Sequence, residues 1–409
     1  MKNWAGNYSY RAAQAITPQS VSHVQELVAQ HDRVHALGSR HSFTDVADTS
    51  GALILLDQLP AQISVNASTA SVTVSAGVRY AELARELHRQ GWALEAMASL
   101  PHISVAGAIA TGTHGSGDRT GTLSSAVCAV ELVGPDGQLR TLTRADADFA
   151  GSVVTAGTLG VLVRLELDIV PTYEIRQDVY LNLGWKAVFD NFDALTSAAY
   201  SVSMFTNWDA AGVYQTWLKG KYDTAPSDLL GAAPASSTQH MLVGGSIDGV
   251  TQQLGEPGPW HERLPHFRAS HNPSRGEELQ SEYLLPREHA LAGIDAMRSL
   301  AKHMAPVIQT AEIRTMRSDD HWLSSAYGHD TVGFHFTWLR DPAGVYAVLP
   351  AMEKALLPLG ARPHWGKCFV AQREQLAPLY PRWDEFLALR SRVDPEGKFA
   401  NEWTQRVFG

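Results

Sequence analysis

The sequence is poor in cysteine and lacks any long hydrophobic run. Its 409 residues include only two cysteines, Cys128 and Cys368, and neither lies in a CxxC or a Cys/His ligand spacing. These facts exclude a disulfide framework and disfavour a structural zinc site. No run approaches the ~18 apolar residues that a membrane-spanning helix needs, and the first ten residues lack the apolar stretch of a signal peptide. We therefore expect a cytoplasmic protein that does not bind a membrane.

Positive charge is also scarce. Lysine and arginine contribute 33 residues against 42 aspartates and glutamates, which gives a net charge of −9. Such a balance argues against nucleic acid or an anionic membrane surface as a partner, so an anionic ligand would have to be held by local groups. Apolar residues make up 44% of the chain, as in a globular protein with a sizeable core. The length suggests roughly two or three domains.

The hydrophobic pattern changes twice along the chain. Residues 1–171 alternate short helices and strands, whereas residues 172–360 carry most of the tryptophans, two clear helices and longer segments such as 241–253 and 331–340 that we interpret as strands. The tail, 361–409, returns to helix and loop. We predict an α+β protein whose first domain is completed by the tail, with a second α+β domain inserted between its two parts.

Three loops rich in glycine and small hydroxyl side chains follow short strands of the first domain. They have the sequences GSRHS (38–42), PHISVAGAIATGTHGSG (101–117) and TAGTLGV (155–161). Glycine lets a backbone approach a ligand closely, and successive N–H groups in such turns form a nest that suits a pyrophosphate. One such loop is more often only a turn, but three in one domain favour a cofactor site. The GxGxxG and GxxxxGK[ST] motifs are absent, so a dinucleotide fold of that type or a nucleotide triphosphatase has little support.

Polar side chains alternate with apolar ones in the second domain. Glu312 and Arg314 are two residues apart, so in a strand they face the same side. In TVGFHFTWL (331–339), His335 and Thr337 alternate with three aromatic residues that belong to the core. Taken singly, these residues are more often an exposed ion pair or a core histidine. Together with His364 and Lys367 of RPHWGKCF, they can line a pocket for an uncharged, polyhydroxylated ligand, because each hydroxyl is both donor and acceptor.

An ordered set of motifs is similar to that of the alditol oxidases (xylitol and sorbitol oxidases), which belong to the vanillyl-alcohol-oxidase flavoprotein superfamily and are close relatives of the sugar-lactone oxidases. The motifs are GSRHSF, MASLPHISVAG, TGTHGSG, EIRT, HFTW, RPHWGK and DPEGKFAN. The resemblance extends from about Trp4 to the C-terminus. It implies an FAD-binding domain, formed by 1–171 and completed by 361–409, and an inserted antiparallel-sheet cap domain, 172–360, that binds the substrate.

The resemblance also implies FAD linked covalently through one histidine, which is His41 here. His114 competes by position, but its loop serves FAD binding in the family. Relatives with a second link use a Gly-X-Cys motif, which neither cysteine matches, so we predict a single bond. Arg40 is bulky where small residues also occur, and its role is open. The other implied cofactor contacts are Gly38, Ser39, Arg40, Ser42, Ser99, Ser104, Gly107, Thr111, Gly112, Thr113, His114, Gly160, Val161 and His364.

The implied activity is the FAD-dependent oxidation of the terminal primary alcohol of acyclic polyols to the aldose, with O₂ reduced to H₂O₂, by a monomer without a metal. The catalytic residues would be Lys367, Arg314, Glu312 and His335, with His335 supporting Glu312. The substrate residues carried over from the family are Ser99, Glu312, Arg314, Thr337 and Lys367.

Three alternatives stay open. One is a sugar-lactone oxidase that acts on a cyclic substrate. The others are a metal-dependent hydrolase, prompted by 17 histidines but without an HExxH motif, and a sugar-binding module without catalysis.

Overall fold

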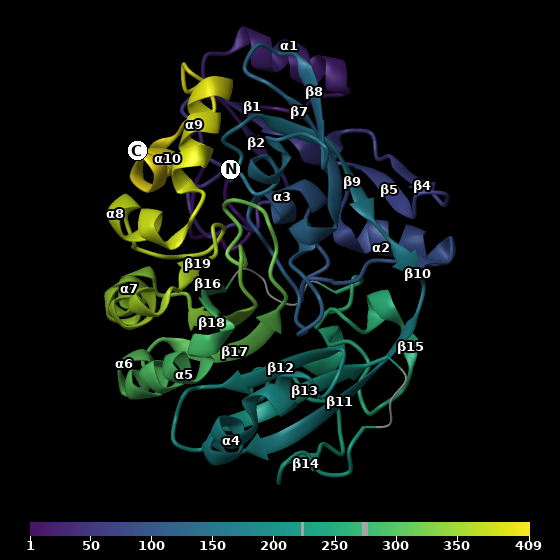
Figure 1. Cartoon of the computed structure of the whole chain (residues 1–409), viewed down its shortest axis with the longest axis vertical. Helices are drawn as coiled ribbons and strands as arrows, with labels where there is room; N and C mark the ends of the chain where they lie inside the picture. Colours follow the sequence, from purple (N-terminus) through teal and green to yellow (C-terminus); the bar gives the residue numbers. More distant parts are fainter. Residues whose placement is uncertain (222–224, 272–276) are drawn as a thin grey trace.

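Two antiparallel sheets form the framework of the protein (Figure 1). The computed structural model describes residues 1–221, 225–271 and 277–409. The first sheet has the strand order β4-β5-β9-β7-β8. Its strands are β4 Ile63–Asn66, β5 Ser71–Ser75, β7 Val127–Val133, β8 Leu139–Thr143 and β9 Val161–Asp168.

Smaller elements complete the N-terminal part of the chain. A parallel sheet has the order β1-β3-β2, and β6 pairs with β10. Helix α1 begins after Ser20, whose hydroxyl accepts the N–H of His23, and turns its buried apolar residues to the core. The bounds are β1 Gln14–Ile16, α1 Val21–Gln30, β2 Val34–Leu37, β3 Ala52–Leu55, α2 Tyr80–Arg89, β6 Trp92–Ala93, α3 Val105–Ala110 and β10 Val170–Pro171.

The second sheet is antiparallel and larger, with the order β14-β11-β13-β12-β17-β18-β16-β19 and with β15 joined to β11. Figure 1 shows helices α4, α5 and α7 on the side of this sheet that faces away from the N-terminal part. The bounds are β11 Glu174–Leu183, α4 Trp185–Thr196, β12 Ser201–Thr206, β13 Val213–Gly220, β14 Ala233–Pro234, β15 Gly258–Pro259, β16 Glu278–Pro286, α5 Ala290–Ser299, α6 Ala301–Met304, β17 Ile308–Met316, β18 Thr331–Leu339, α7 Pro342–Leu356 and β19 Arg362–Pro363.

Strand β18 has the two faces that the sequence predicts. Phe334, Phe336 and Trp338 are fully buried, and the rings of Phe336 and Trp338 stack with centroids 5.2 Å apart. The opposite face carries His335 and Thr337. His335 lies in register between Glu312 of β17 and Glu282 of β16, so that one row of polar residues crosses three strands.

The C-terminal segment returns to the N-terminal part (Figure 1). It contains α8 Arg373–Leu376, α9 Trp383–Val393 and α10 Glu402–Phe408. The N–H of Val34 donates to the carbonyl of Lys398 at 3.0 Å, and the N–H of Phe43 donates to that of Gly366 at 2.8 Å. The loop after β2 is thereby tied to the segment that carries His364 and Lys367.

The strand predicted over 241–253 is wrong. This segment consists of bends, turns and loop residues with one 3₁₀ turn, Ile247–Gly249, and its strand-like pairing is limited to an isolated bridge from Val250 to Phe267. Gly244 has a φ of +80°, outside the strand region, and Val243 is 84% exposed, so the segment offers no continuous apolar face to a sheet. Within the described residues, no helix is long and apolar enough to cross a membrane.

Candidate active site

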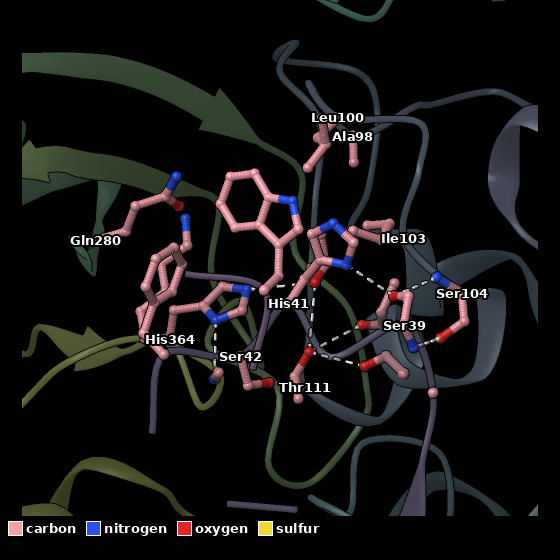
Figure 2. A pocket seen from close by; sticks show the side chains of 18 of the residues that line it. Ser39, His41, Ser42, Ala98, Leu100, Ile103, Ser104, Thr111, Gln280 and His364 are labelled. Carbon is pink, nitrogen blue, oxygen red and sulfur yellow. Dashed lines mark hydrogen bonds between the residues drawn. The ribbon is translucent and has the colours of Figure 1, made fainter. Parts of the chain in front are cut away.

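A cavity of about 320 Å³ lies where the glycine-rich loops meet the polar face of the larger sheet. The loops after β2 and before α3 form one part of its wall, and β16, β17 and β18 form another. In Figure 2, Ser39, His41 and Ser104 lie on one side of the view, and Gln280 and His364 lie on the other. The cavity thus brings both groups of predicted residues, those for the cofactor and those for the substrate, to one place.

His41 is held by its neighbours in the loop after β2. Its Nδ1 lies 3.0 Å from the hydroxyl of Ser39, and its ring stacks on Trp4 with centroids 5.1 Å apart. Ser39 and Ser104 bond reciprocally, because each backbone N–H donates to the hydroxyl of the other residue, at 3.3 and 2.9 Å. Burial, reinforced by the charge of Arg79, lowers the pKa of His41 to about 3. The imidazole is therefore neutral at physiological pH and keeps a nitrogen lone pair.

Gly38 is not the residue that adopts the left-handed backbone conformation in the turn before His41. The residue in the left-handed region is Arg40, with a φ of +64°, and its carbonyl accepts the N–H of Trp4 at 2.8 Å. Gly38 serves close approach instead, since a Cβ built on it would lie 2.2 Å from the hydroxyl oxygen of Ser104. The sequence reveals the glycine but not which residue carries the turn.

Gly38→Ala tests this close approach. The hydroxyl of Ser104 must turn away and give up the N–H of Ser39, so we expect the free energy of unfolding to fall by about 1–3 kcal/mol. The matched control is Gly184→Ala, because Gly184 has no neighbouring atom within 4 Å of the added Cβ and has a φ of −70°. Urea unfolding of both variants measures the difference. Equal effects of the two substitutions would contradict the role of Gly38.

Most predicted cofactor residues line the cavity. They are Gly38, Ser39, Arg40, His41, Ser42, Ser99, Ser104, Gly107, Thr111, Thr113, His114, Gly160 and His364. Gly112 and Val161 are not on its wall. Gly112 supplies a turn with a φ of +70°, and Val161 is fully buried in β9 beside Gly160, which does reach the cavity.

A buried carboxylate that the sequence analysis missed lies at the centre of the charged groups. Glu282 of β16 accepts hydrogen bonds from Lys367 Nζ at 2.6 Å and from Arg314 at 2.8 Å. Burial raises the pKa of this carboxylate, but the positive charges of Lys367 and Arg314 outweigh burial, and the pKa of Glu282 lies well below its ordinary value. Burial lowers the pKa of Lys367, and Glu282 opposes that shift.

The second carboxylate, Glu312, has a different partner from the one predicted. His266 Nε2 lies 2.9 Å from Glu312 Oε1, and Arg314 Nε lies 3.6 Å from Glu312 Oε2. Burial works against ionisation, yet Arg314 and His266 lower the pKa of Glu312 below its ordinary range. His335 was expected to support Glu312, but its Nε2 bonds the side-chain oxygen of Gln280 at 3.0 Å.

The two histidines near the glycine-rich loop are also engaged. His364 Nδ1 accepts the N–H of Gly366 at 3.1 Å, so its proton lies on Nε2, which is 3.4 Å from the hydroxyl of Thr113. Burial lowers the pKa of His364 well below its ordinary value. His114 bonds the Gly115 carbonyl through Nδ1 at 2.9 Å, and its Nε2 is 3.2 Å from Glu282.

The cavity wall therefore balances its charges. On the sheet side, two carboxylates, Glu282 and Glu312, face two cations, Arg314 and Lys367, and the hydroxyls of Ser99 and Thr337 lie on the same wall. Arg40 and Glu278, which also line the cavity, add one charge of each sign. Arg314 also reaches Ser99, at 3.3 Å. A wall rich in donors and acceptors but without excess charge suits an uncharged ligand that carries several hydroxyls.

The sequence analysis missed Gln280, Glu282 and His266, and only the first two could have been predicted from the sequence. Gln280 and Glu282 are two apart in the strand ELQSEYLLP, the same spacing that singled out Glu312 and Arg314. His266 lies in an irregular segment between Pro265 and Phe267, where no periodicity indicates the direction of a side chain.

Several known proteins are similar to this chain. The family model "FAD binding domain" matches residues 12–143, and the model "D-arabinono-1,4-lactone oxidase" matches residues 273–407. The chain is 45% identical over 409 residues to an alditol oxidase of Streptomyces sp., covering 99% of this chain and 98% of that protein. It is 27% identical to the L-gulono-1,4-lactone dehydrogenase of Mycobacterium tuberculosis, over 100% and 98% of the two chains. Among solved structures, cholesterol oxidase from B. sterolicum superposes with a TM-score of 0.80 at 15% identity, over 100% of this chain and 96% of that one.

Proposed function

The chain belongs to the alditol oxidase family, and from this premise we propose that it oxidises the terminal primary alcohol of acyclic polyols such as xylitol and sorbitol to the aldehyde of the aldose, with O₂ as electron acceptor and H₂O₂ as the second product. The 45% identity to an alditol oxidase over nearly the whole chain carries the proposal. The α+β, two-domain flavoprotein fold predicted from the sequence is confirmed by the FAD-binding family model and by the superposition on cholesterol oxidase.

The glycine-rich side of the cavity fits FAD. Gly38 and Gly107 leave room that a Cβ would fill beside Ser104, and the hydroxyls of Thr111 and Thr113 lie on the wall near them. Bound FAD supplies the hydride acceptor and the site that reacts with O₂. We propose that His41 holds it covalently, since its imidazole is neutral and is anchored by Ser39 and Trp4.

The sheet side of the cavity supplies the groups for the substrate. In our proposal, Lys367 and Arg314 donate to the oxygen of the reacting hydroxyl and stabilise the negative charge that develops as its proton leaves. Glu312 accepts from a hydroxyl further along the polyol, while Thr337 binds a more distant one and Ser99 lies beside Arg314. His335 stays neutral, because burial lowers its pKa well below the ordinary value, and it fixes Gln280 rather than Glu312.

Relative rates on open-chain and cyclic substrates test this function. A sugar-lactone oxidase is the alternative, favoured by the family model over 273–407 and by the gulonolactone-related proteins at 25–27% identity. We expect kcat/KM for xylitol or sorbitol to exceed that for L-gulono-1,4-lactone by at least about tenfold, because binding groups placed for hydroxyls of an open chain discriminate against a ring. A peroxidase-coupled assay of H₂O₂ gives both rates.

If the lactone is turned over faster than the polyols, the protein is a sugar-lactone oxidase and the proposed polyol oxidation is wrong. Stopped-flow mixing of the reduced enzyme with air-saturated buffer tests the acceptor, and a flavin that stays reduced on the timescale of turnover would contradict the use of O₂.

The domain boundaries, the oligomeric state and the cellular location are also proposals. The hydrogen bonds from Val34 to Lys398 and from Phe43 to Gly366 support a first domain made of 1–171 and 361–409, with 172–360 as the cap. A monomeric state and a cytoplasmic location stay predictions.

A further inference from the structure

A buried lysine lies behind Glu312, at the end of a chain of hydrogen bonds that starts at the cavity. Lys219 of β13 is only 1% exposed, and its Nζ lies 3.0 Å from His266 Nδ1. The other ring nitrogen, His266 Nε2, lies 2.9 Å from Glu312 Oε1. Of these three residues, Glu312 and His266 line the cavity, whereas Lys219 is one step behind them.

The two partners of the His266 ring determine its tautomer. Lys219 Nζ contacts three acceptors, which are the carbonyls of Leu264 and Pro265 and the Nδ1 atom of His266. Burial lowers the pKa of Lys219 to about 7, so the lysine alone does not fix the tautomer. The carboxylate of Glu312 does, because its pKa is lowered and an ionised carboxylate only accepts, so the imidazole proton lies on Nε2 and Nδ1 accepts from Nζ. That proton points to Glu312. Burial lowers the pKa of His266 to about 4, so the ring is neutral and has this single N–H to donate.

The ring of His266 has little freedom to move. It meets the rings of Phe205 and Trp217 edge-on, with centroids 5.7 and 5.0 Å away. Its backbone N–H donates to the carbonyl of Ser99 at 3.0 Å, and its carbonyl accepts the N–H of Thr251 at 3.0 Å. One residue therefore ties together Ser99 and Glu312, both of which we assign to the substrate.

Glu312 has a competing partner. Arg314 Nε lies 3.6 Å from Glu312 Oε2 and has no hydrogen-bond acceptor within the described residues, so a carboxylate free to rotate would pair with the guanidinium through both oxygens. Such a pair would turn one lone pair of each oxygen to the guanidinium and leave a hydroxyl only the outer lone pairs. The bond from His266 to Oε1 prevents the rotation and keeps Oε2 available.

We propose that Lys219 and His266 are positioning residues, which hold Glu312 in the one orientation that leaves a carboxylate oxygen free to accept a hydroxyl of the polyol. The inference rests on the proposed function and adds two residues to its substrate site. A preoriented acceptor lowers the cost of ordering on binding, so its loss weakens the grip on substrate more than it slows the chemical step.

The test compares four variants as flavin-loaded enzymes. Lys219→Met and His266→Leu break the chain with side chains of similar size, and we expect each to raise KM for xylitol about tenfold with kcat within about threefold of the wild-type value. His266→Gln restores both contacts, because the amide oxygen can accept from Lys219 and the amide N–H can donate to Glu312, so its KM should stay within about threefold. Lys221→Met is the matched control, since Lys221 lies over the rings of Tyr173 and Tyr200 and interacts with the charge of Glu95, outside the chain from Lys219 to Glu312.

A measurement on the wild-type protein keeps the proposal falsifiable even where a variant fails to fold. ¹⁵N NMR of histidine-labelled holoenzyme, with the His266 signals assigned by their loss in His266→Gln, reports which ring nitrogen carries the proton. A proton on Nε2 supports the proposal, and a proton on Nδ1 overturns it. Equal KM values for wild type, Lys219→Met and His266→Leu also overturn it, as does a His266→Gln variant that resembles His266→Leu. A wild-type enzyme that turns over no polyol refutes the proposed function instead, which separates the two failures.

Discussion

His41→Ala is expected to release the yellow colour into the supernatant when the protein is precipitated with acid, whereas the wild-type pellet stays yellow. Covalent attachment needs an imidazole nitrogen with a free lone pair. His41 meets this condition, because burial lowers its pKa to about 3 and because its ring is held by the Ser39 hydroxyl and by stacking on Trp4. The absorbance of pellet and supernatant near the flavin maximum measures the result.

His114→Ala is the discriminating comparison. His114 donates through Nδ1 to the Gly115 carbonyl at 2.9 Å, and Glu282 Oε1 lies 3.2 Å from its Nε2, in the place that a flavin carbon would need for a bond to that nitrogen. We expect the His114→Ala pellet to remain yellow. A yellow pellet from His41→Ala, together with a colourless one from His114→Ala, would move the link to His114.

The charge balance of the site explains how Lys367 and Arg314 can lie close together in one buried cavity. Lys367 and Arg314 share one carboxylate, Glu282, which is 1% exposed and therefore cannot exchange its partners for water. A buried ion pair broken on one side leaves an uncompensated charge, which is strongly destabilising. The second carboxylate, Glu312, restores neutrality on the sheet side of the cavity.

Local patterns predicted the parts of this site that lie on regular strands. Alternation gave the polar face of β18, with His335 and Thr337 opposite buried aromatic rings, and the same rule placed Glu312 and Arg314 together. Partners across segments were not predictable in this way. The row of Glu312, His335 and Glu282 depends on strand register, and register does not reveal that His335 bonds Gln280, which is not opposite it, and neither of the two carboxylates that are.

Irregular segments were the main source of error. The stretch 241–253 has enough apolar residues to resemble a strand, but its glycines turn the chain, and it contributes Met241 and Leu242 to the cavity wall instead. His266 and its partner Lys219 lie 47 positions apart, and only the tertiary fold brings a buried lysine within 3.0 Å of that ring. The sequence around each shows no feature that separates it from an ordinary surface residue.

Lys367→Met should produce the largest loss of activity. Its Nζ is the only lysine ammonium on the cavity wall of the described residues, and in our proposal it donates to the reacting oxygen beside Arg314. Loss of one such donor typically lowers kcat about 10²–10³-fold. Steady-state H₂O₂ production at saturating xylitol measures the loss, with flavin content as the check on folding. The control is Lys354→Met, on the exposed side of α7. A kcat within about threefold of the wild-type value would exclude Lys367 from the chemistry.

Glu282→Gln tests the role of the Lys367 ammonium group by changing the pKa of that lysine. Burial lowers the pKa of Lys367, and the negative charge of Glu282, 2.6 Å away, partly restores it. Removal of that charge lowers the pKa further. If the ammonium form donates to the substrate, activity is present below this pKa and is lost as the pH rises through it, so the alkaline limb of the kcat profile should shift to lower pH in Glu282→Gln. An alkaline limb at the wild-type position would show that another group, and not Lys367, controls the high-pH loss of activity.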